Sequence, residues 1–329
     1  MVGWGMPRRP HTPPEDLPNR SFSTTEARSL GLTAHHLEGP GYRQLTRGVW
    51  IPAHLQTPAD PTERVRTQLH GLLEAKHDCA ASHLTAAQLL GLRLPDALRR
   101  DTRLHITRHN GYRPPGGHNV HGHCAELPPE DLVSMGGILS TGPARTAIDL
   151  AAMRELRWFR ISDDDLVALL DGIICEHANG PLAGSEPMRS LPGLSADLDR
   201  MKGKRGVRRV RLALQRCAVG ADSMLETRAR LLLAHYDHTT PWITDHQLQA
   251  PGHRTVWPDL ADVEHRLSLQ LDGPHHESPE QRLRDMDRLR ATEAAGWTEI
   301  RVSFRDLQPI GAQLPALIHL VRQARRRRQ

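Results

Sequence analysis

Residues from 222 to the C-terminus contain an ordered succession of helical and extended segments, which constrains the fold more than any other feature. Residues 222–235 have helical periodicity, and strands follow within about 245–272. A helix at 278–295 then precedes a strand at 298–303 and a final helix at 310–324. Helix, strands, helix and strand in this order predict a compact mixed sheet with flanking helices.

One strand of this region carries an unusual polar face. In "LSLQLDGPHH" (267–276), leucines alternate with Ser268, Gln270 and Asp272, so apolar and polar side chains point to opposite faces. Asp259, in "WPDLAD", precedes Gln270 by eleven residues, which suits two paired strands joined by a short turn. This hairpin is expected to bring Asp259 close to Gln270 and Asp272, with Glu226 on a helix packed nearby.

These oxygen-bearing side chains have two explanations. Mg²⁺ takes oxygen ligands, keeps several waters and binds substrate phosphate, so Asp259, Glu226 and Asp272 are candidate metal ligands. A histidine just past the strand end, His276, is the candidate base that deprotonates an attacking water. The alternative is a solvated sheet edge, because Pro-Asp and Asp-Gly dipeptides are also common turn formers.

Three charged residues further along suit the same chemistry. Asp285, Arg288 and Arg301 are expected to orient the site, and the two arginines are candidates for holding phosphate or DNA.

The segments "SMLETRARLLL", "PDLADVEHRLSLQLDGPHH" and "QRLRDMDRLRATEAAGWTEIRVSFRDL" resemble a known family. They are similar to endonuclease-like domains related to very-short-patch-repair endonucleases, within the PD-(D/E)XK nuclease superfamily. The positions that follow the family pattern, in order, are Glu226, Asp259, Asp272-Gly273, His276, Asp285, Arg288, Gly296-Trp297 and Arg301.

The resemblance implies a restriction-endonuclease-like fold and phosphodiester hydrolysis that depends on Mg²⁺ or Mn²⁺. It makes Asp259 the principal metal ligand, helped by Glu226, and makes His276 the base. Gln270 and Asp272 occupy the strand that carries the ExK-like positions. The chain departs from these relatives at Gln270, where they usually carry Glu, and a neutral amide oxygen binds a divalent cation more weakly. The neighbouring strand carbonyl is an alternative ligand.

A second pattern lies near the N-terminus, in "SFSTTEARSLGLTAHHLEGPGYRQLTRGVWIP". Ser23 or Thr24 can cap a short helix that ends at Gly31, and Thr33 can cap a second helix. A hairpin is expected to turn at Arg47-Gly48. Helix, turn, helix and hairpin in this order predict a winged helix.

This N-terminal stretch resembles the winged-helix domain of AbiEi-type antitoxins, which act as transcriptional repressors. The helix after Thr33 is then expected to enter a major groove, with Arg43 and Arg47 on the wing contacting phosphates. The alternative is a scaffold whose arginines are merely solvated. "AASHLTAAQLLGL", "RLHITR" and "STGPARTAIDLA" resemble the region that follows it in actinobacterial proteins ending in the nuclease-like domain.

The expected fold class is multidomain α+β or α/β. The predicted organisation is a flexible tail (1–20), a winged-helix-like domain (21–54), a mixed α/β middle region (55–175), a Gly- and Pro-rich linker (176–205) and a nuclease-like domain (206–329). In the middle region, helices are predicted within 60–100, strands at 103–108, 119–124 and about 136–140, and helices starting near Pro143 and at Ser162.

Two further motifs each have two interpretations. "HNVHGHCAEL" brings together His118, His121, His123 and Cys124, which suggests zinc, although on a strand the cysteine faces away from His121 and His123. A polar strand face is the alternative. The arginines of "RGVRRVRLALQRC" are explained either by a solvated helix or by contacts to a DNA backbone.

Charge and cysteine content set the remaining expectations. A net charge of +5 permits a polyanionic partner, while 4% aromatic residues disfavour stacking on single strands. The four cysteines lie far apart without a CxxC pair, as expected for free thiols in a reducing cytoplasm. The N-terminus lacks the apolar core of a signal peptide, and no membrane span is expected.

The sequence thus predicts a cytoplasmic, metal-dependent endonuclease with an N-terminal DNA-binding winged helix. Double-stranded DNA is the expected partner and RNA the alternative; no membrane partner is expected, and the sequence indicates no oligomeric state. A second hypothesis is an antitoxin-like DNA-binding transcriptional regulator whose nuclease fold is catalytically inactive.

Overall fold

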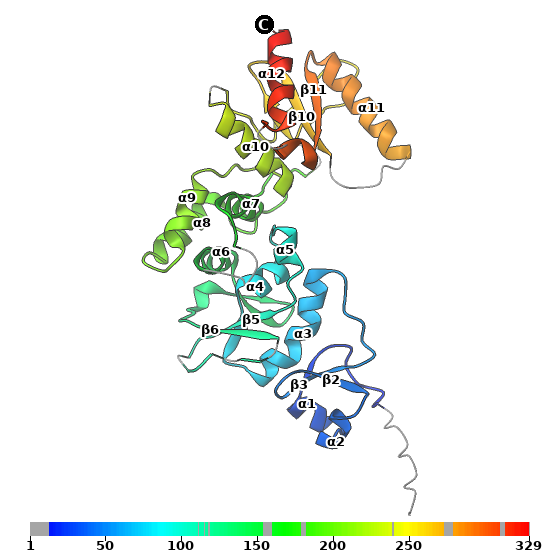
Figure 1. The fold of residues 1–329 in the computed structure, drawn as a ribbon, viewed down its shortest axis with the longest axis vertical. Coiled ribbons are helices and arrows are strands. Elements are labelled where there is room, and N and C mark those ends of the chain that lie inside the picture. Colours follow the sequence, from blue (N-terminus) through cyan, green and yellow to red (C-terminus); the bar gives the residue numbers. More distant parts are fainter. Residues whose placement is uncertain are drawn as a thin grey trace, which may run out of the picture. The chain divides into compact units, whose positions relative to one another are not determined.

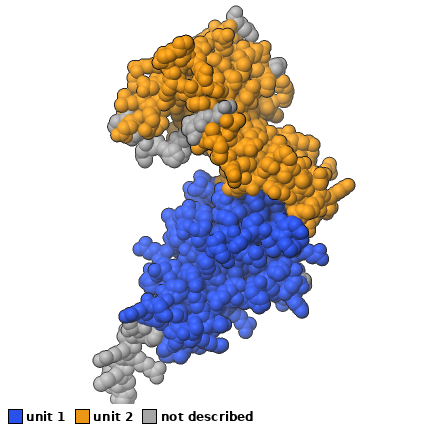
Figure 2. Space-filling view, turned by 180° about the vertical axis from the view of Figure 1, so that it is seen from behind, with its two compact units in different colours: residues 1–92, 96–150 blue, residues 93–95, 151–329 orange. Residues whose placement is uncertain are grey.

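A computed structural model describes residues 13–110, 112–114, 116–117, 119–153, 160–178, 182–238, 240–272, 279–309 and 313–328. The chain forms two compact units, one of residues 1–92 and 96–150 and the other of residues 93–95 and 151–329 (Figures 1 and 2). Helices and three sheets are present, which confirms the expected mixture of α and β structure. Among the described residues, no helix combines the length and apolar character needed to cross a membrane.

The first two helices begin where the sequence predicts. The hydroxyl of Ser23 caps α1 (Thr24–Ser29), accepting a hydrogen bond of 2.9 Å from a backbone N–H in the first turn. Thr33 caps α2 (Ala34–Leu37) in the same way, and the His36 side chain completes a capping box. The second helix is therefore a single turn.

The predicted hairpin is also present. β2 (Tyr42–Thr46) and β3 (Val49–Pro52) pair antiparallel on either side of Gly48, whose φ of +79° suits glycine. β1 (Phe22–Ser23) adds to β3, so the strand order is β1-β3-β2. Residues 13–20 of the predicted tail are described, and within them Leu17 packs against the small core beneath this sheet.

α3 (Pro61–Ala75) joins this small sheet to the rest of the first unit. At Gly71 a Cβ would lie 2.4 Å from the backbone of Phe22, so only glycine lets the helix approach β1 this closely. The hydroxyl of Ser21 donates a hydrogen bond of 2.8 Å to the carbonyl of Gln68 in the same helix. Residues 21–54 and the region that follows therefore belong to one compact unit.

The first unit also contains a five-stranded sheet of order β6-β5-β4-β8-β7. Its strands are β4 (Cys79–Ala81), β5 (Leu104–Arg108), β6 (Val120–Cys124), β7 (Leu132–Met135) and β8 (Ile138–Thr141). The helices of this region are α4 (His83–Leu89), α5 (Asp96–Arg99) and α6 (Pro143–Ala152). β5 pairs parallel with β6, and β4 pairs parallel with β8. The strands predicted near 103, 119 and 136 are present, whereas β7 was not predicted and β4 lies within a stretch that was predicted to be helical.

The second unit begins with four helices, α7 (Asp163–Ile173), α8 (Leu191–Arg200), α9 (Val207–Leu214) and α10 (Met224–Tyr236). Ser162 caps α7 as predicted. Each of the three aspartates in its first turn forms an ion pair with an arginine. Asp163 pairs with Arg209 of α9, Asp164 pairs with Arg216 just after α9, and Asp165 pairs with Arg228 of α10. Arg209 and Arg216 of the basic segment, together with Arg211 through Asp199, are therefore engaged within the protein.

Two sequence-based boundaries differ from the structure. α7 was assigned to the middle region but packs against α9 and α10, within the second unit. The predicted linker at 176–205 contains α8, whose Leu194 and Leu198 are buried. The sequence predicted a linker here because the segment is rich in glycine, proline and serine. The helix α8 was missed because it is short and has only a narrow apolar stripe.

The C-terminal sheet has the order β11-β10-β9, formed by β9 (Leu260–Asp262), β10 (Leu267–Asp272) and β11 (Thr298–Ser303). β10 is antiparallel to β9 and parallel to β11, which confirms the predicted mixed sheet. The remaining helices are α11 (Pro279–Ala294) and α12 (Ala316–Arg328). The predicted strand region before β9 contributes only an isolated bridge, between Leu248 and Val256.

The leucines of β10 lie in a core formed with α10 and α12, which includes Ala229, Leu233, Leu267, Leu269 and Leu317. The alternation seen in the sequence therefore directs Gln270 and Asp272 to the opposite face of the sheet. Trp297 packs with Leu248, Val256 and Ala291, as expected for a structural tryptophan.

Candidate functional site

The hairpin of β9 and β10 brings Asp259 beside Gln270, as predicted. Asp259 lies one residue beyond the paired residues Leu260 and Leu269. Its Oδ2 accepts hydrogen bonds from Gln270 Nε2 at 2.8 Å and from the backbone N–H of Leu271 at 2.6 Å. The carboxylate is thus held against β10.

Glu226 approaches the same place from the first turn of α10. Ser223 caps this helix by accepting a hydrogen bond of 3.1 Å from the Glu226 backbone N–H. The Glu226 side chain is buried, and its Oε2 accepts a hydrogen bond of 2.7 Å from the backbone N–H of Asp222. The N-terminal turn of the helix therefore directs this carboxyl group inward.

Glu226 and Asp259 influence each other electrostatically. Burial, and secondarily the Asp259 carboxylate, raise the pKa of Glu226 to about 7. Burial raises the pKa of Asp259 to about 6, although the N–H of Leu271 and the charge of Arg288 act in the opposite direction. The raised pKa values mean that both carboxyl groups tend to keep a proton. A bound cation would favour their ionised forms.

Both carboxyl groups line one pocket, with a volume of about 60 Å³. The other residues that line it are His177, Leu182, Gly220, Asp222, Asp245, Trp257 and Pro258. The volume corresponds to about two water molecules at ~30 Å³ each, which suits a cation with part of its hydration shell.

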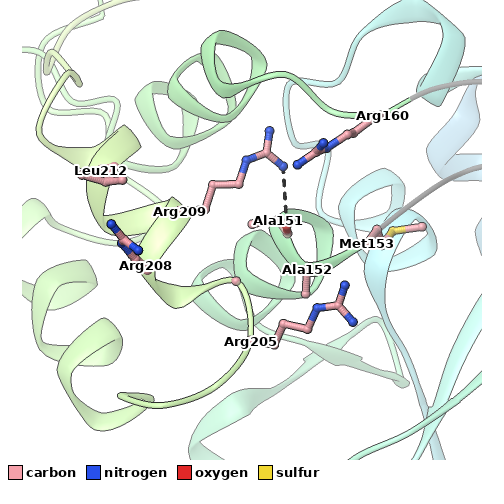
Figure 3. A pocket seen from close by; sticks show the side chains of 9 residues that line it. Ala151, Ala152, Met153, Arg160, Arg205, Arg208, Arg209 and Leu212 are labelled. Carbon is pink, nitrogen blue, oxygen red and sulfur yellow. Dashed lines mark hydrogen bonds between the residues drawn. The ribbon is translucent and has the colours of Figure 1, made fainter.

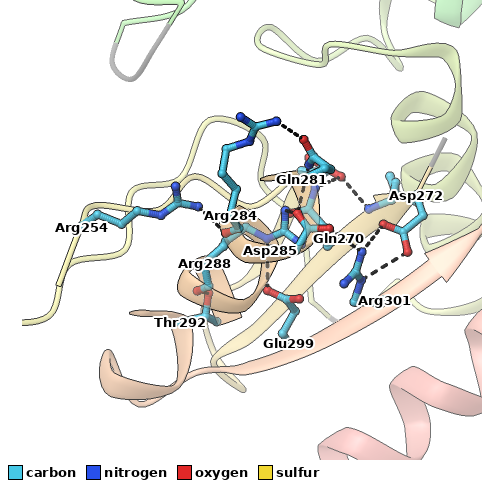
Figure 4. Close-up of polar contacts among 12 residues, drawn as sticks. Arg254, Gln270, Asp272, Gln281, Arg284, Asp285, Arg288, Thr292, Glu299 and Arg301 are labelled. Carbon is cyan, nitrogen blue, oxygen red and sulfur yellow. Dashed lines mark hydrogen bonds and ion pairs between the residues drawn. The ribbon is translucent and has the colours of Figure 1, made fainter. Parts of the chain in front are cut away.

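Asp272 does not line this pocket and instead pairs with Arg301. The guanidinium of Arg301 donates to both oxygens of Asp272, at 2.8 and 3.2 Å, and to Asp285 at 3.1 Å (Figure 4). The hydrogen bonds to Asp272 are the main reason that the pKa of Arg301 is raised. The structure therefore brings Asp259 together with Glu226, and Asp272 together with Arg301.

Arg288 connects this ion-pair network to the pocket. Its guanidinium contacts Asp285 at 3.0 Å and Glu299 of β11 at 3.5 Å (Figure 4). Its charge also lowers the pKa of Asp259. The three charged residues predicted from the sequence, Asp285, Arg288 and Arg301, are thus assembled on the polar face of the sheet. His276, the predicted base, lies outside the described residues, as does Gly273.

Several pocket residues were not expected from the sequence. His177 lies within the predicted linker, and Asp222 and Asp245 belong to segments that carried no assigned role. Cys175, the residue before the predicted linker begins, does not line the pocket but contacts His177 and Asp222 beside it. The sequence signal for this group was the Cys-x-His spacing of Cys175 and His177 at the end of a helix. The partner of His177, Asp222, lies 45 residues further along the chain, so the sequence did not connect them.

Two of the histidines considered for zinc, His121 and His123, lie in a stacked set with His83 and His105 in the first unit. The ring of His123 stacks on His83 with centroids 3.6 Å apart, and His105 stacks on His121 at 5.1 Å. His105 Nδ1 and His123 Nε2 are hydrogen-bonded at 3.0 Å. Burial, followed by neighbouring charges that include other histidines, lowers the pKa of His83, His105 and His123 to about 3.

This stack agrees with the polar strand face that was the alternative to zinc. His121 and His123 share one face of β6, as predicted. Cys124 is exposed, and its neighbour in the motif, His118, lies outside the described residues.

A basic pocket lies at the start of α9, with a volume of about 580 Å³ (Figure 3). The exposed arginines Arg160, Arg205 and Arg208 line it, together with Arg209. Arg209 is engaged with Asp163 and with the carbonyls of Ala151 and Ile161. In the first unit, Arg43 is exposed on β2 and Arg47 is exposed in the turn after it.

Comparison of the chain with protein-family models, with curated proteins and with solved structures gave no significant match.

Proposed function

We propose that this chain is a metal-dependent endonuclease that hydrolyses phosphodiester bonds of double-stranded DNA. The observation that carries the proposal is the pair of carboxyl groups of Glu226 and Asp259. Glu226 lies in α10 and Asp259 immediately precedes β9; the two share one pocket, and their pKa values are raised to about 7 and about 6. Burial and neighbouring like charges are combined at enzyme active sites, where together they shift pKa values.

The order of elements supports the same proposal. α10, β9, β10, α11 and β11 follow one another as helix, hairpin, helix and parallel strand, the order that the resemblance to PD-(D/E)XK nucleases implies. In the proposed arrangement Asp259 and Glu226 hold Mg²⁺ or Mn²⁺, and Gln270 keeps Asp259 oriented. A cation bound there would lower the pKa of its water and offset negative charge on the phosphate.

The remaining residues take supporting roles in this proposal. Asp272 and Asp285 hold the guanidinium of Arg301 on the polar face of the sheet, where it and Arg288 can face the scissile phosphate. His276 is retained as the base that accepts a proton from the attacking water.

Residues 21–54 are proposed to act as a winged-helix-like DNA-binding element. α2 offers only one helical turn, so backbone contacts from Arg43 and Arg47 would contribute more to binding than base recognition. Arg160, Arg205 and Arg208 provide a second set of exposed cations for phosphates.

The test is nicking of supercoiled plasmid DNA by the full chain with Mg²⁺ or Mn²⁺. Asp259→Ala and Glu226→Gln are expected to abolish nicking, because each removes one anionic ligand. Asp287→Ala is the matched control, since Asp287 is an exposed aspartate of α11 paired with Arg290.

Two results would oppose the proposal. Wild-type protein that does not nick DNA but binds a duplex through residues 21–54 would favour the regulator with an inactive nuclease fold. Nicking that persists in Asp259→Ala would point to a contaminating nuclease.

A further inference from the structure

Three side chains with metal-ligating atoms meet beside the pocket that contains Glu226. Cys175 Sγ lies 3.6 Å from His177 Nε2 and 3.7 Å from Asp222 Oδ1. His177 Nε2 lies 2.8 Å from the same oxygen of Asp222. Of the groups of His, Cys, Asp and Glu in the described part of the chain, this one has the spacing required to hold a metal ion.

We propose that Cys175, His177 and Asp222 bind one Zn²⁺ ion, independently of the proposed nuclease function. Tetrahedral zinc with Zn–S of ~2.3 Å and Zn–N and Zn–O of ~2.0–2.2 Å requires ligand atoms ~3.4–3.6 Å apart. Both distances from the sulfur agree with this geometry. The distance between nitrogen and oxygen is that of a hydrogen bond, and it opens when the half-exposed Asp222 side chain turns slightly.

The second ring nitrogen of His177 provides independent support. Nδ1 faces Asp245 Oδ1 at 3.5 Å, while Asp245 Oδ2 accepts a hydrogen bond of 3.2 Å from the N–H of Ala178. A histidine that binds zinc typically donates its other N–H to a carboxylate in this way, which orients the ring. Gly220 leaves room for this carboxylate, because a Cβ there would lie 3.0 Å from Asp245 Cβ.

The segments that carry the ligands are held together by Asp171. This fully buried carboxylate accepts hydrogen bonds from the Ala218 N–H at 2.9 Å, from the Thr227 hydroxyl at 2.8 Å and from Arg230 at 2.8 Å. Asp171 lies in α7, just before Cys175, and Thr227 lies in α10, just after Asp222. The ligands are therefore positioned before any metal binds.

The ligand types indicate which metal binds. A thiolate and an imidazole suit Zn²⁺ or Co²⁺, whereas Mg²⁺ prefers oxygen ligands alone. The Cys175 thiol, which donates to the carbonyl of Ala221 at 3.2 Å, releases its proton to solvent when the thiolate binds. Three protein ligands leave a fourth position for water. Asp222 links this site to Glu226 through its backbone N–H.

The test is titration of the full chain, stripped of metal with a chelator, with Co²⁺. A thiolate-to-Co²⁺ charge-transfer band that saturates at one equivalent, and that Zn²⁺ abolishes, is expected for the wild type. Cys175→Ser and His177→Ala should each remove the band. Cys124→Ser, which changes an exposed cysteine of the other unit, should retain it.

Absence of the band in the wild type, or its survival in Cys175→Ser, would overturn the proposal. Circular dichroism of each metal-free variant checks that it is folded. As a variant that retains all three ligands, Asp245→Asn should keep the band and lower the affinity for Zn²⁺ by about 10–100-fold. Unchanged affinity in Asp245→Asn would also contradict the proposed geometry.

One comparison separates this proposal from the nuclease proposal. Asp259→Asn should abolish plasmid nicking and leave the Co²⁺ band unchanged. Loss of the band in Asp259→Asn would contradict a site made by Cys175, His177 and Asp222 alone. If the wild-type protein leaves the plasmid intact, the nuclease proposal fails, whereas the Co²⁺ titration still tests the zinc proposal on its own.

Discussion

The side-chain amide of Gln270 donates a hydrogen bond of 2.8 Å to the carboxylate of Asp259. A glutamate at this position, which the sequence resemblance would lead one to expect, would repel Asp259. The amide instead stabilises a negative charge on Asp259, and it lowers the pKa of that carboxyl group against the effect of burial. The hydrogen bond therefore stabilises the ionised Asp259 carboxylate in its buried position.

Gln270→Glu is expected to strengthen binding of a divalent cation. The substitution places a second carboxylate against Asp259, so cation affinity should rise by at least about tenfold, as expected for an added charged ligand. Without a cation, repulsion should lower the thermal stability. Isothermal titration with Mn²⁺ and thermal unfolding with and without Mn²⁺ measure both effects. Gln270→Ala, which removes the hydrogen bond without adding charge, is the control, and equal Mn²⁺ affinity in the two variants would contradict the expectation.

Glu226→Gln is expected to stabilise the metal-free protein at alkaline pH. The pKa of Glu226 is raised from 4.5 to about 7 in the folded state, so the folded protein binds this proton more tightly than the unfolded chain. Stability is therefore lost as the pH rises from about 4.5 to about 7. At pH 8 the variant should be more stable by about 3 kcal/mol, with little difference near pH 4.5. Urea unfolding across this range measures the effect, and parallel pH profiles of the two proteins would argue against it.

The histidine stack predicts a loss of stability in acid. The pKa of His83, His105 and His123 is lowered from 6.5 to about 3, so the unfolded chain takes up these protons first. Stability should be retained above pH 6.5 and fall as the pH decreases towards 3. Each histidine contributes up to about 1.4 kcal/mol per pH unit in this range.

His123→Gln should reduce this pH dependence. Urea unfolding at pH 7.5 and pH 5 compares it with the wild type and with His54→Gln, a control at an exposed histidine of the same unit. An identical loss of stability in all three proteins would show that the stack does not cause the acid sensitivity.

Replacement of Arg160, Arg205 and Arg208 by alanine is expected to weaken binding to duplex DNA. If all three contact phosphates, the slope of log affinity against log salt concentration should decrease in magnitude by about 3. Fluorescence anisotropy with a labelled duplex at several salt concentrations measures this slope. Arg290→Ala, at an exposed arginine of α11, is the control. An unchanged slope would show that these arginines do not contact DNA phosphates.

Local signals in the sequence were sufficient for the capped helix starts and the hairpins, although the final helix, predicted from 310, begins at Ala316. Ser23, Thr33 and Ser162 cap helices as predicted, because a capping hydrogen bond joins residues only three apart. The alternation of leucines in β10 determined which face is buried, and the spacing from Asp259 to Gln270 determined that these residues meet. Both depend on strand geometry that repeats every second residue.

The tertiary structure decided which charged groups become partners. The parallel register of β10 and β11 places Gln270 opposite Arg301, and from there the guanidinium reaches Asp272 and Asp285. Asp272 thereby becomes an ion-pair partner, although the sequence alone made it a candidate metal ligand. Likewise, packing of α7 against α10 brings His177 to Asp222. No periodicity in a single segment encodes such pairs, because they depend on how separate elements pack around a shared core.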